Sequence, residues 1–254
     1  MGLFGTVKRK FKKNVNKVLE SAMGLRIDSV RAHGRTDWYD IKKSGCRIET
    51  VFDVGANVGQ SAHKFREAFP RANIYSFEPV RALFEELQKS GPGDEHVRCF
   101  QLALGSAPGI GKIYFTDHPT MNSLIEPENS LGSEEVQIDT VDSFCAAHDI
   151  ERIDLLKVDA EGFDLEVLKG AASLLSSGRV AFVLAEVGFH SDGTSHVLFD
   201  SVREFLVPYG FRVFGFYDQN LEWSGEKRLR FANVCFSNEK AFRGNTEIRN
   251  DRGR

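Results

Sequence analysis

From residue 50 onward, short apolar segments alternate with amphipathic ones, and this alternation constrains the fold more than any other feature of the chain. The apolar or β-branched segments that predict strands are Thr50–Val54, Asn73–Phe77, Val97–Gln101, Ile153–Val158 and Val180–Glu186. The segments between them that predict helices are Gln60–Ala68, Val80–Lys89, Val141–His148 and Phe163–Leu175. Near-continuous apolar strands that alternate with helices indicate a parallel sheet covered on both faces. We therefore predict a doubly wound α/β domain.

Two regions depart from this alternation. Lys112–Phe115 and Val136–Asp139 predict a pair of strands that flank a segment rich in Gly, Pro and Asn, Thr116–Ser133. We interpret this long segment as a lid or substrate loop. The remaining elements are a helix at His196–Val207, strands at Phe211–Phe216 and Arg230–Phe236, and a turn region between them at Tyr217–Gly225. The last two strands are expected to form an antiparallel edge.

Composition and charge exclude several classes of protein. Hydrophobic residues make up 41% of the 254 and charged residues 27%, which is typical of a soluble globular chain. The formal net charge of −3 gives no reason to expect a nucleic-acid partner. The cysteines are far apart in the sequence and form no C-x-x-C pair, so neither a zinc module nor a disulfide framework is predicted. Because no long apolar run or signal peptide is recognised, we expect a cytoplasmic protein.

The N-terminus differs in charge from the rest of the chain. Residues 1–26 contain seven basic residues and one acidic residue, and the spacing of apolar residues predicts a basic amphipathic helix over residues 3–24. Such a helix either packs on its own domain or lies on an anionic membrane surface as a peripheral contact. We divide the chain into this helix at 1–26, a main domain at 27–240 and a flexible polar tail at 241–254.

The first predicted strand leads into a glycine turn. Asp53 lies near the end of the strand, and Gly55 and Gly59 allow the backbone to approach a ligand closely. A dinucleotide site would prefer G-x-G-x-x-G, but Asn57 occupies the position of the second glycine. The D-x-G-x-x-x-G form suits a ligand without phosphate, and the nearby carboxylate favours a cationic amino acid group, such as that of S-adenosylmethionine.

The second predicted strand also ends in an acidic residue. Glu78 follows the strand and precedes Pro79. A carboxylate at this place in a nucleotide-binding fold accepts the hydroxyl groups of a ribose. Together with the glycine turn, Glu78 predicts a site for a nucleoside cofactor.

These segments resemble the FkbM family of methyltransferases. The resemblance rests on Phe52–Gly59, Ser76–Pro79, Ala103–Gly105 and, above all, Ile153–Ala171. It implies a class I, Rossmann-like methyltransferase fold with seven strands, a mostly parallel sheet with an antiparallel edge strand, and helices on both faces. It also implies S-adenosylmethionine as cofactor and O-methyl transfer to a hydroxyl. The main domain at 27–240 would then be the methyltransferase domain.

The resemblance also assigns cofactor contacts to residues of this chain. The residues implied at the methionine end are Asp53, Gly55, Ala56, Asn57 and Gly59. Glu78 would contact the ribose, and Ala103 and Leu104 would lie on the adenine side. Ala160 departs mildly from the family pattern, which usually has a larger aliphatic residue at this position.

Methyl transfer to an aliphatic hydroxyl requires a group that takes its proton. Asp159 is the first candidate, because ligands of open α/β sheets bind outside the carboxyl ends of the strands. The further candidates are Glu161, Glu186 and His190. Lys157 lies two residues before Asp159 on the same face of the strand and is expected to pair with a neighbouring acid.

A second interpretation of the acidic residues is a metal site. Asp159, Glu161 and Glu186 are suitable ligands for Mg²⁺, which would acidify a bound sugar hydroxyl. In the long loop, Asn122 and Ser123 are candidates to hydrogen-bond a polyhydroxylated acceptor, although such residues also form ordinary turns.

The sequence therefore predicts an S-adenosylmethionine-dependent methyltransferase that acts on a hydroxyl of a saccharide, a glycan or a related natural product. One alternative is a nicotinamide-dependent oxidoreductase, which Asn57 and the lack of a Tyr-x-x-x-Lys element disfavour. Another is a membrane-surface adaptor that retains the fold without activity. The intact acidic residues argue against the adaptor, because a decayed site need not keep them.

Overall fold

The computed structural model of the protein describes residues 37–90, 93–115, 122–125, 130–191, 196–222, 225 and 227–242. The basic helix predicted at residues 3–24 lies outside this part of the chain, as does most of the polar tail predicted at 241–254. In the described ranges, no helix is long and apolar enough to cross a membrane.

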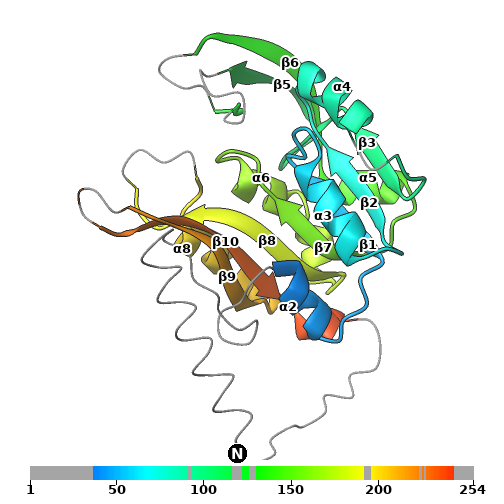
Figure 1. Ribbon diagram of the computed structural model, residues 1–254, viewed down its shortest axis with the longest axis vertical. Coiled ribbons are helices and arrows are strands. Elements are labelled where there is room, and N and C mark those ends of the chain that lie inside the picture. Colours follow the sequence, from blue (N-terminus) through cyan, green and yellow to red (C-terminus); the bar gives the residue numbers. More distant parts are fainter. Residues whose placement is uncertain are drawn as a thin grey trace, which may run out of the picture. The chain divides into compact units, whose positions relative to one another are not determined.

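A seven-stranded sheet with the order β3-β2-β1-β7-β8-β10-β9 lies at the centre of the domain (Figure 1). The parallel strands are β1 (Thr50–Val54), β2 (Asn73–Phe77), β3 (Val97–Phe100), β7 (Ile153–Val158) and β8 (Val180–Gly188). The hairpin of β9 (Arg212–Leu221) and β10 (Leu229–Ser237) forms the antiparallel edge. The predicted fold is confirmed. Because β1 pairs with β2 on one side and β7 on the other, their carboxyl ends mark the switch point where such sheets bind ligands.

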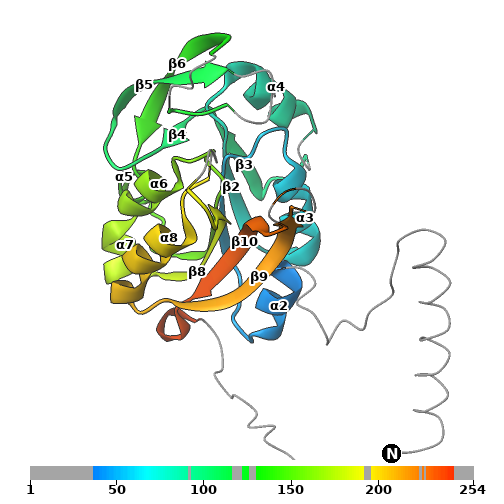
Figure 2. The ribbon, with the colours of Figure 1, turned by 90° about the vertical axis from the view of Figure 1, so that its left-hand side faces the viewer.

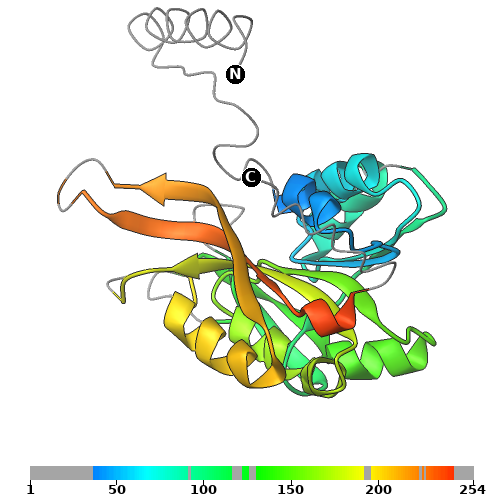
Figure 3. The ribbon, with the colours of Figure 1, turned by 90° about the horizontal axis from the view of Figure 1, so that it is seen from below.

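Helices cover both faces of the sheet (Figures 2 and 3). One face carries α2 (Asp37–Lys43) and α3 (Gln60–Ala68), and the other carries α5 (Val141–Ala147), α6 (Asp164–Lys169), α7 (Ala172–Ser176) and α8 (Phe199–Leu206). Strand side chains alternate between the faces. Phe52 therefore packs in one core with Phe144, whereas Val51 packs in the other with Phe65. This double burial explains why the strands read as continuous apolar segments.

An aromatic cluster fixes the first three strands to α5. The ring centroid of Phe77 lies 5.2 Å from that of Phe52 and 4.8 Å from that of Phe144. Phe100 of β3 contacts Phe144 edge-on at 4.9 Å. Edge-to-face pairs contribute about 0.5–1.5 kcal/mol each beyond the area they bury. These contacts therefore hold in place the strands whose ends form the site.

A second, three-stranded sheet with the order β4-β6-β5 lies beside the carboxyl ends of the main strands (Figure 1). It consists of β4 (Ala103–Leu104), β5 (Gly109–Phe115) and β6 (Gly132–Asp139), and α4 (Arg81–Ser90) lies between β2 and β3 in the chain. The predicted strand pair is thereby confirmed, although both strands are longer than predicted and β6 begins inside the predicted loop Thr116–Ser133. Strand β4 was not predicted. Part of the predicted long loop is ordered by this sheet, because Ser123 and Tyr114 exchange two backbone hydrogen bonds.

Two predicted elements were wrong in detail. The single helix predicted at Phe163–Leu175 is divided into α6 and α7 at Gly170, where a Cβ atom would lie 2.0 Å from the carbonyl oxygen of Gly105. The first turn of α7 is capped by Asp142 of α5, whose carboxylate accepts hydrogen bonds from the backbone amides of residues 173 and 174. The turn predicted at Tyr217–Gly225 is shorter, because β9 continues to Leu221 by pairing with β10.

Candidate functional site

The loops that follow β1 and β7 meet at the switch point of the sheet. Gly55 has a φ of +73°, and a Cβ atom at this position would lie 1.9 Å from the carbonyl oxygen of Asp159. The Asp159 amide donates to the carbonyl oxygen of Val54 at 3.2 Å. Only glycine combines this backbone conformation with so close an approach. The glycine turn therefore brings the two loops together as the floor of a pocket.

A buried lysine connects the ends of β1 and β7. The Nζ atom of Lys157 lies 3.1 Å from Oδ1 of Asp53 and 3.2 Å from Oδ2 of Asp159, and it donates to the carbonyl oxygen of Gly55 at 3.0 Å. Burial lowers the pKa of Lys157, but Asp159 and Asp53 outweigh this effect and raise it above its ordinary value. For Asp53, burial raises the pKa and Lys157 opposes that rise. Lys157 is thus the counter-ion of both carboxylates.

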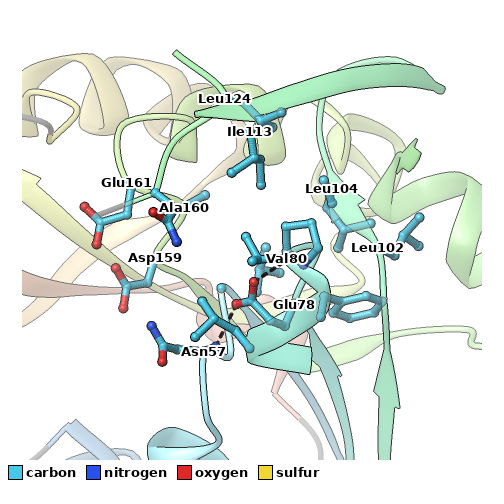
Figure 4. Close-up of a pocket in the computed structure, with 17 residues that line it drawn as sticks. Asn57, Glu78, Val80, Leu102, Leu104, Ile113, Leu124, Asp159, Ala160 and Glu161 are labelled. Carbon is cyan, nitrogen blue, oxygen red and sulfur yellow. Dashed lines mark hydrogen bonds between the residues drawn. The ribbon is translucent and has the colours of Figure 1, made fainter. Parts of the chain in front are cut away.

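Glu78 turns its carboxylate into the same pocket (Figure 4). Its Oε2 atom accepts a hydrogen bond from the Asn57 amide, and its Oε1 atom accepts one from the Val80 amide, both at 2.9 Å. Burial raises the pKa of Glu78 to about 7, although both amides and Lys157 oppose the rise. Since a carboxylate oxygen has room for two hydrogen bonds, each oxygen retains capacity for a ligand hydroxyl.

Apolar side chains form the rest of the pocket wall. They are Val54, Phe77, Val80, Leu83, Leu102, Ala103, Leu104, Ile113, Leu124 and Ala160. Figure 4 shows Leu102 and Leu104 on one side, with Ile113 and Leu124 above, whereas Asp159 and Glu161 lie together on the opposite side. The pocket therefore offers an apolar compartment at one end, Glu78 in the middle and two acidic residues at the other end. A nucleoside with a cationic tail matches this distribution of chemistry.

Glu161 lies in the tight loop between β7 and α6. Its φ of +48° is uncommon for a residue with a side chain. Two contacts hold the loop in this shape: the Ser123 hydroxyl donates to the carbonyl oxygen of Glu161 at 2.7 Å, and Asp164 accepts from the Gly162 amide at 3.2 Å. The loop is thus fixed on one side by Ser123, which pairs with β5 of the small sheet, and on the other by Asp164, the first residue of α6.

Glu161 has an environment suited to proton transfer. Burial raises its pKa to about 7, and the neighbouring charges of Asp159 and Glu186 add to this rise while His196 opposes it. A general base works best when its pKa lies near the operating pH. Asp159 differs, since its Oδ2 atom is already paired with Lys157. Glu161 is therefore suited to exchange a proton near neutral pH.

The histidine beside these acids is His196. Its Nε2 atom lies 2.9 Å from Oε2 of Glu186, and its ring stacks on Phe231 with the centroids 4.6 Å apart. The sequence pointed to His190 instead, because that residue comes soon after Glu186 in the chain. His190 lines a separate hollow with Phe189, Phe199 and Arg228. No local feature of the sequence distinguishes His196 from His190. His196 meets Glu186 only because of the way the chain folds before α8.

The structure separates the predicted cofactor residues into two groups. The residues that line the pocket are Gly55, Asn57, Glu78, Ala103 and Leu104. The others support it from below: Asp53 is buried against Lys157, the Ala56 amide donates to the carbonyl oxygen of Phe77, and Gly59 caps the start of α3 with a φ of 97°. Asn122 also lines the pocket, while Ser123 acts through the backbone of the Glu161 loop.

The arrangement does not support the metal site that the sequence suggested. Within the described ranges, no three His, Cys, Asp or Glu side chains gather closely enough to hold a metal ion. Asp159, one of the three candidate ligands, is instead paired with the ammonium group of Lys157.

Two curated proteins with sequence similarity to the chain are methyltransferases. The chain is 29% identical over 142 residues to the hexuronic acid methyltransferase AglP of Haloferax volcanii, covering 55% of this chain and 56% of that protein. It is 28% identical over 153 residues to the 2-O-methyltransferase NoeI of Sinorhizobium fredii, covering 52% and 61%. The chain therefore matches little more than half the length of these relatives.

Solved structures with similar folds have low sequence identity. An rRNA methylase from Streptococcus thermophilus aligns with a TM-score of 0.47 and 10% identity, covering 83% of this chain and 99% of that one. A TehB-like methyltransferase from Corynebacterium glutamicum aligns with a TM-score of 0.40 and 9% identity, covering 92% and 100%. At this level of similarity, neither structure informs on the substrate.

A family model gives the decisive comparison. The methyltransferase FkbM domain matches residues 53–213, which include the glycine turn, Glu78, the Lys157–Glu161 segment and Glu186. Because this match spans more than half of the chain, the protein belongs to the FkbM methyltransferase family.

Proposed function

We propose that the protein transfers a methyl group from S-adenosylmethionine to a hydroxyl of a saccharide, a glycan or a related natural product. The observation that carries this proposal is the pocket at the switch point, where the Glu78 carboxylate separates an apolar compartment from Asp159 and Glu161. The name of one relative, a hexuronic acid methyltransferase, supports a sugar acceptor, and the name of the other, a 2-O-methyltransferase, supports transfer to oxygen.

The residues present fit the cofactor. The Glu78 oxygens would accept two ribose hydroxyls, since each already accepts only one amide hydrogen bond, and the apolar side chains around Leu104 would contact the adenine. The amino acid end would then reach the floor formed by Gly55 and Asp159, where the carboxylate faces its cationic groups. Lys157 holds that carboxylate in place from below.

The chain contributes mainly by positioning the acceptor and accepting its proton. When bound, S-adenosylmethionine supplies the methyl group, whose bond to the acceptor oxygen forms as its bond to sulfur breaks and the electron pair stays on sulfur. Glu161 takes the proton of the acceptor hydroxyl, since its pKa of about 7 leaves a substantial anionic fraction at neutral pH. Transfer is favoured when the acceptor oxygen is held close to the methyl carbon in a site without water.

Calorimetric titration tests the cofactor assignment. The wild-type protein is titrated with S-adenosylmethionine and, separately, with NADH. We expect binding of S-adenosylmethionine alone, and an affinity about tenfold or more lower in Glu78→Gln, because a hydrogen bond to a charged group contributes about 1.5–3 kcal/mol. Glu67→Gln, on the exposed surface of α3, is the matched control and should bind like the wild type. Binding of NADH would instead support the oxidoreductase.

A turnover assay tests the acceptor. The protein is incubated with S-adenosylmethionine and a panel of hydroxylated sugars that includes uronic acids, and S-adenosylhomocysteine is measured. Formation of S-adenosylhomocysteine that depends on a sugar supports the proposal. Cofactor binding without turnover on any hydroxylated acceptor would favour the adaptor.

We also propose a cytoplasmic location with peripheral membrane contact through residues 3–24. The sequence supports this by its excess of basic residues on an amphipathic pattern. Vesicles with and without anionic lipid, sedimented at low and high salt, test the contact. Binding that requires anionic lipid and weakens with salt is expected, because salt screens lysine-driven attraction. Equal absence of binding in all conditions would contradict it.

A further inference from the structure

A second ionic pair lies next to the acids of the pocket, because Ala185 of β8 pairs with Val158 of β7 and Glu186 therefore lies at the same edge of the sheet as Asp159. His196 precedes α8, and its partner Glu186 lies near the carboxyl end of β8. The side chain of His196 is only 14% exposed, because its ring is stacked on Phe231 of β10. Contacts with Glu186 of β8 and Phe231 of β10 thus hold the His196 imidazole beside the site, and the proposed reaction does not use this group.

The surroundings of His196 favour its charged form. Burial lowers its pKa, but the hydrogen bond and the charge of Glu186 raise it, and the charges of Glu161 and Asp164 raise it further. The net result is a pKa above the ordinary histidine value. His196 therefore keeps its proton to a higher pH than an ordinary histidine does, because the charges of three carboxylates act on it.

Glu161 needs such a cation. The charged groups that act most strongly on it are three other acids, Asp159, Glu186 and Asp164, and His196 is the cation among these groups. Lys157 is committed to Asp53 and Asp159 on the floor of the pocket. Crowded carboxylates favour protonation of one of them, and a protonated acid accepts no further proton.

We propose that His196, held in place by Glu186, is a positioning residue of the methyl-transfer site, which supplies a positive charge among the acids around Glu161 and keeps that carboxylate free to accept the proton of the acceptor hydroxyl. This inference rests on the proposed function for the identity of the hydroxyl. The placement of the charge does not depend on it, because the pair is formed by β8, β10 and the segment before α8.

The test is a pH titration of Glu161 in the free, full-length protein. Glutamate is labelled with ¹³C at the side-chain carboxyl carbon, and the Glu161 resonance is assigned by its loss in Glu161→Gln. In the wild type we expect a midpoint near 7. In His196→Gln, whose side-chain amide can still donate to Glu186, the midpoint should rise by about one pH unit, as expected when a nearby opposite charge is lost.

Two further variants separate charge from structure. His196→Lys keeps a positive charge and should return the midpoint toward that of the wild type. His63→Gln, on the exposed surface of α3, should leave it unchanged. An unchanged midpoint in His196→Gln, or an equal shift in His63→Gln, would overturn the proposal. If His196→Gln unfolds, Glu186→Gln replaces it, and the ¹⁵N-detected midpoint of the His196 ring must then fall.

The outcome is independent of the cofactor test. The titration uses neither S-adenosylmethionine nor an acceptor, so a wild type that fails to bind the cofactor refutes the proposed function while the Glu161 midpoint remains readable. Conversely, if the wild type methylates a sugar but the Glu161 midpoint is the same in the wild type and in His196→Gln, only this inference is refuted.

Discussion

Replacing Lys157 with Met tests the most consequential electrostatic contact of the domain. The substitution keeps an unbranched side chain of similar length but removes the ammonium that pairs with Asp53 at 3.1 Å and Asp159 at 3.2 Å. Asp53 is fully buried, so its carboxylate would be left without a counter-ion. Removal of one partner of a buried ion pair costs about 3–5 kcal/mol. For a domain of this size, that predicts a melting temperature lower by about 6–20 °C.

The loss depends on pH in a defined direction. In Lys157→Met, burial raises the pKa of Asp53 without opposition, so the folded state holds a proton that the unfolded state releases. Stability of the variant is therefore retained at low pH and falls as the pH rises. We expect the difference in unfolding free energy from the wild type to be larger at pH 8 than at pH 5.

The assay is urea unfolding at both pH values, followed by tryptophan fluorescence. Lys169→Met is the matched control, because Lys169 forms a surface pair with Glu166 and should cost at most about 1 kcal/mol. Adding Asp53→Asn to Lys157→Met should recover part of the loss, since no charge then remains buried at that position. Equal losses in Lys157→Met and Lys169→Met, with no dependence on pH, would refute the reasoning.

Three further predictions follow from the pocket. Gly55→Ala should lower the unfolding free energy by about 2–5 kcal/mol in urea, from a left-handed φ and a contact with the Asp159 backbone. Gly45 also has a left-handed φ, of +83°, but a Cβ atom there would meet no neighbour, so Gly45→Ala should lose only the free energy due to the backbone conformation. Equal losses of unfolding free energy in the two variants would contradict the close contact at Gly55. The pKa values of Glu78 and Glu161, raised to about 7, imply stability that is present at low pH and is lost as the pH rises toward 7, so a melting temperature that does not fall between pH 5 and pH 8 would contradict them. Calorimetry should show weaker S-adenosylmethionine binding below about pH 7, as Glu78 takes up a proton, with a flatter pH dependence in Glu78→Gln; equal pH dependence in both would contradict the ribose contact.

The sequence by itself determined the central sheet and the pocket floor. Thr50–Val54, Asn73–Phe77 and Gln60–Ala68 have the same bounds in the structure as in the prediction. These elements are encoded locally, because burial on both faces requires continuous apolar strands and burial on one face requires a helical period. Gly55 and Glu78 were found for the same reason, since each directly follows a recognisable strand.

Only the tertiary structure decided which side chains meet. The Lys157–Asp53 pair and the support of the Glu161 loop by Ser123 join residues that are far apart in the chain, whereas the choice of His196 over His190 depends on which of the two side chains faces Glu186. Strand β4 has two residues and exists through its pairing with β6, so it has no period to detect. Local periodicity reports which face of an element is buried, whereas the path of a loop depends on the contacts that close it.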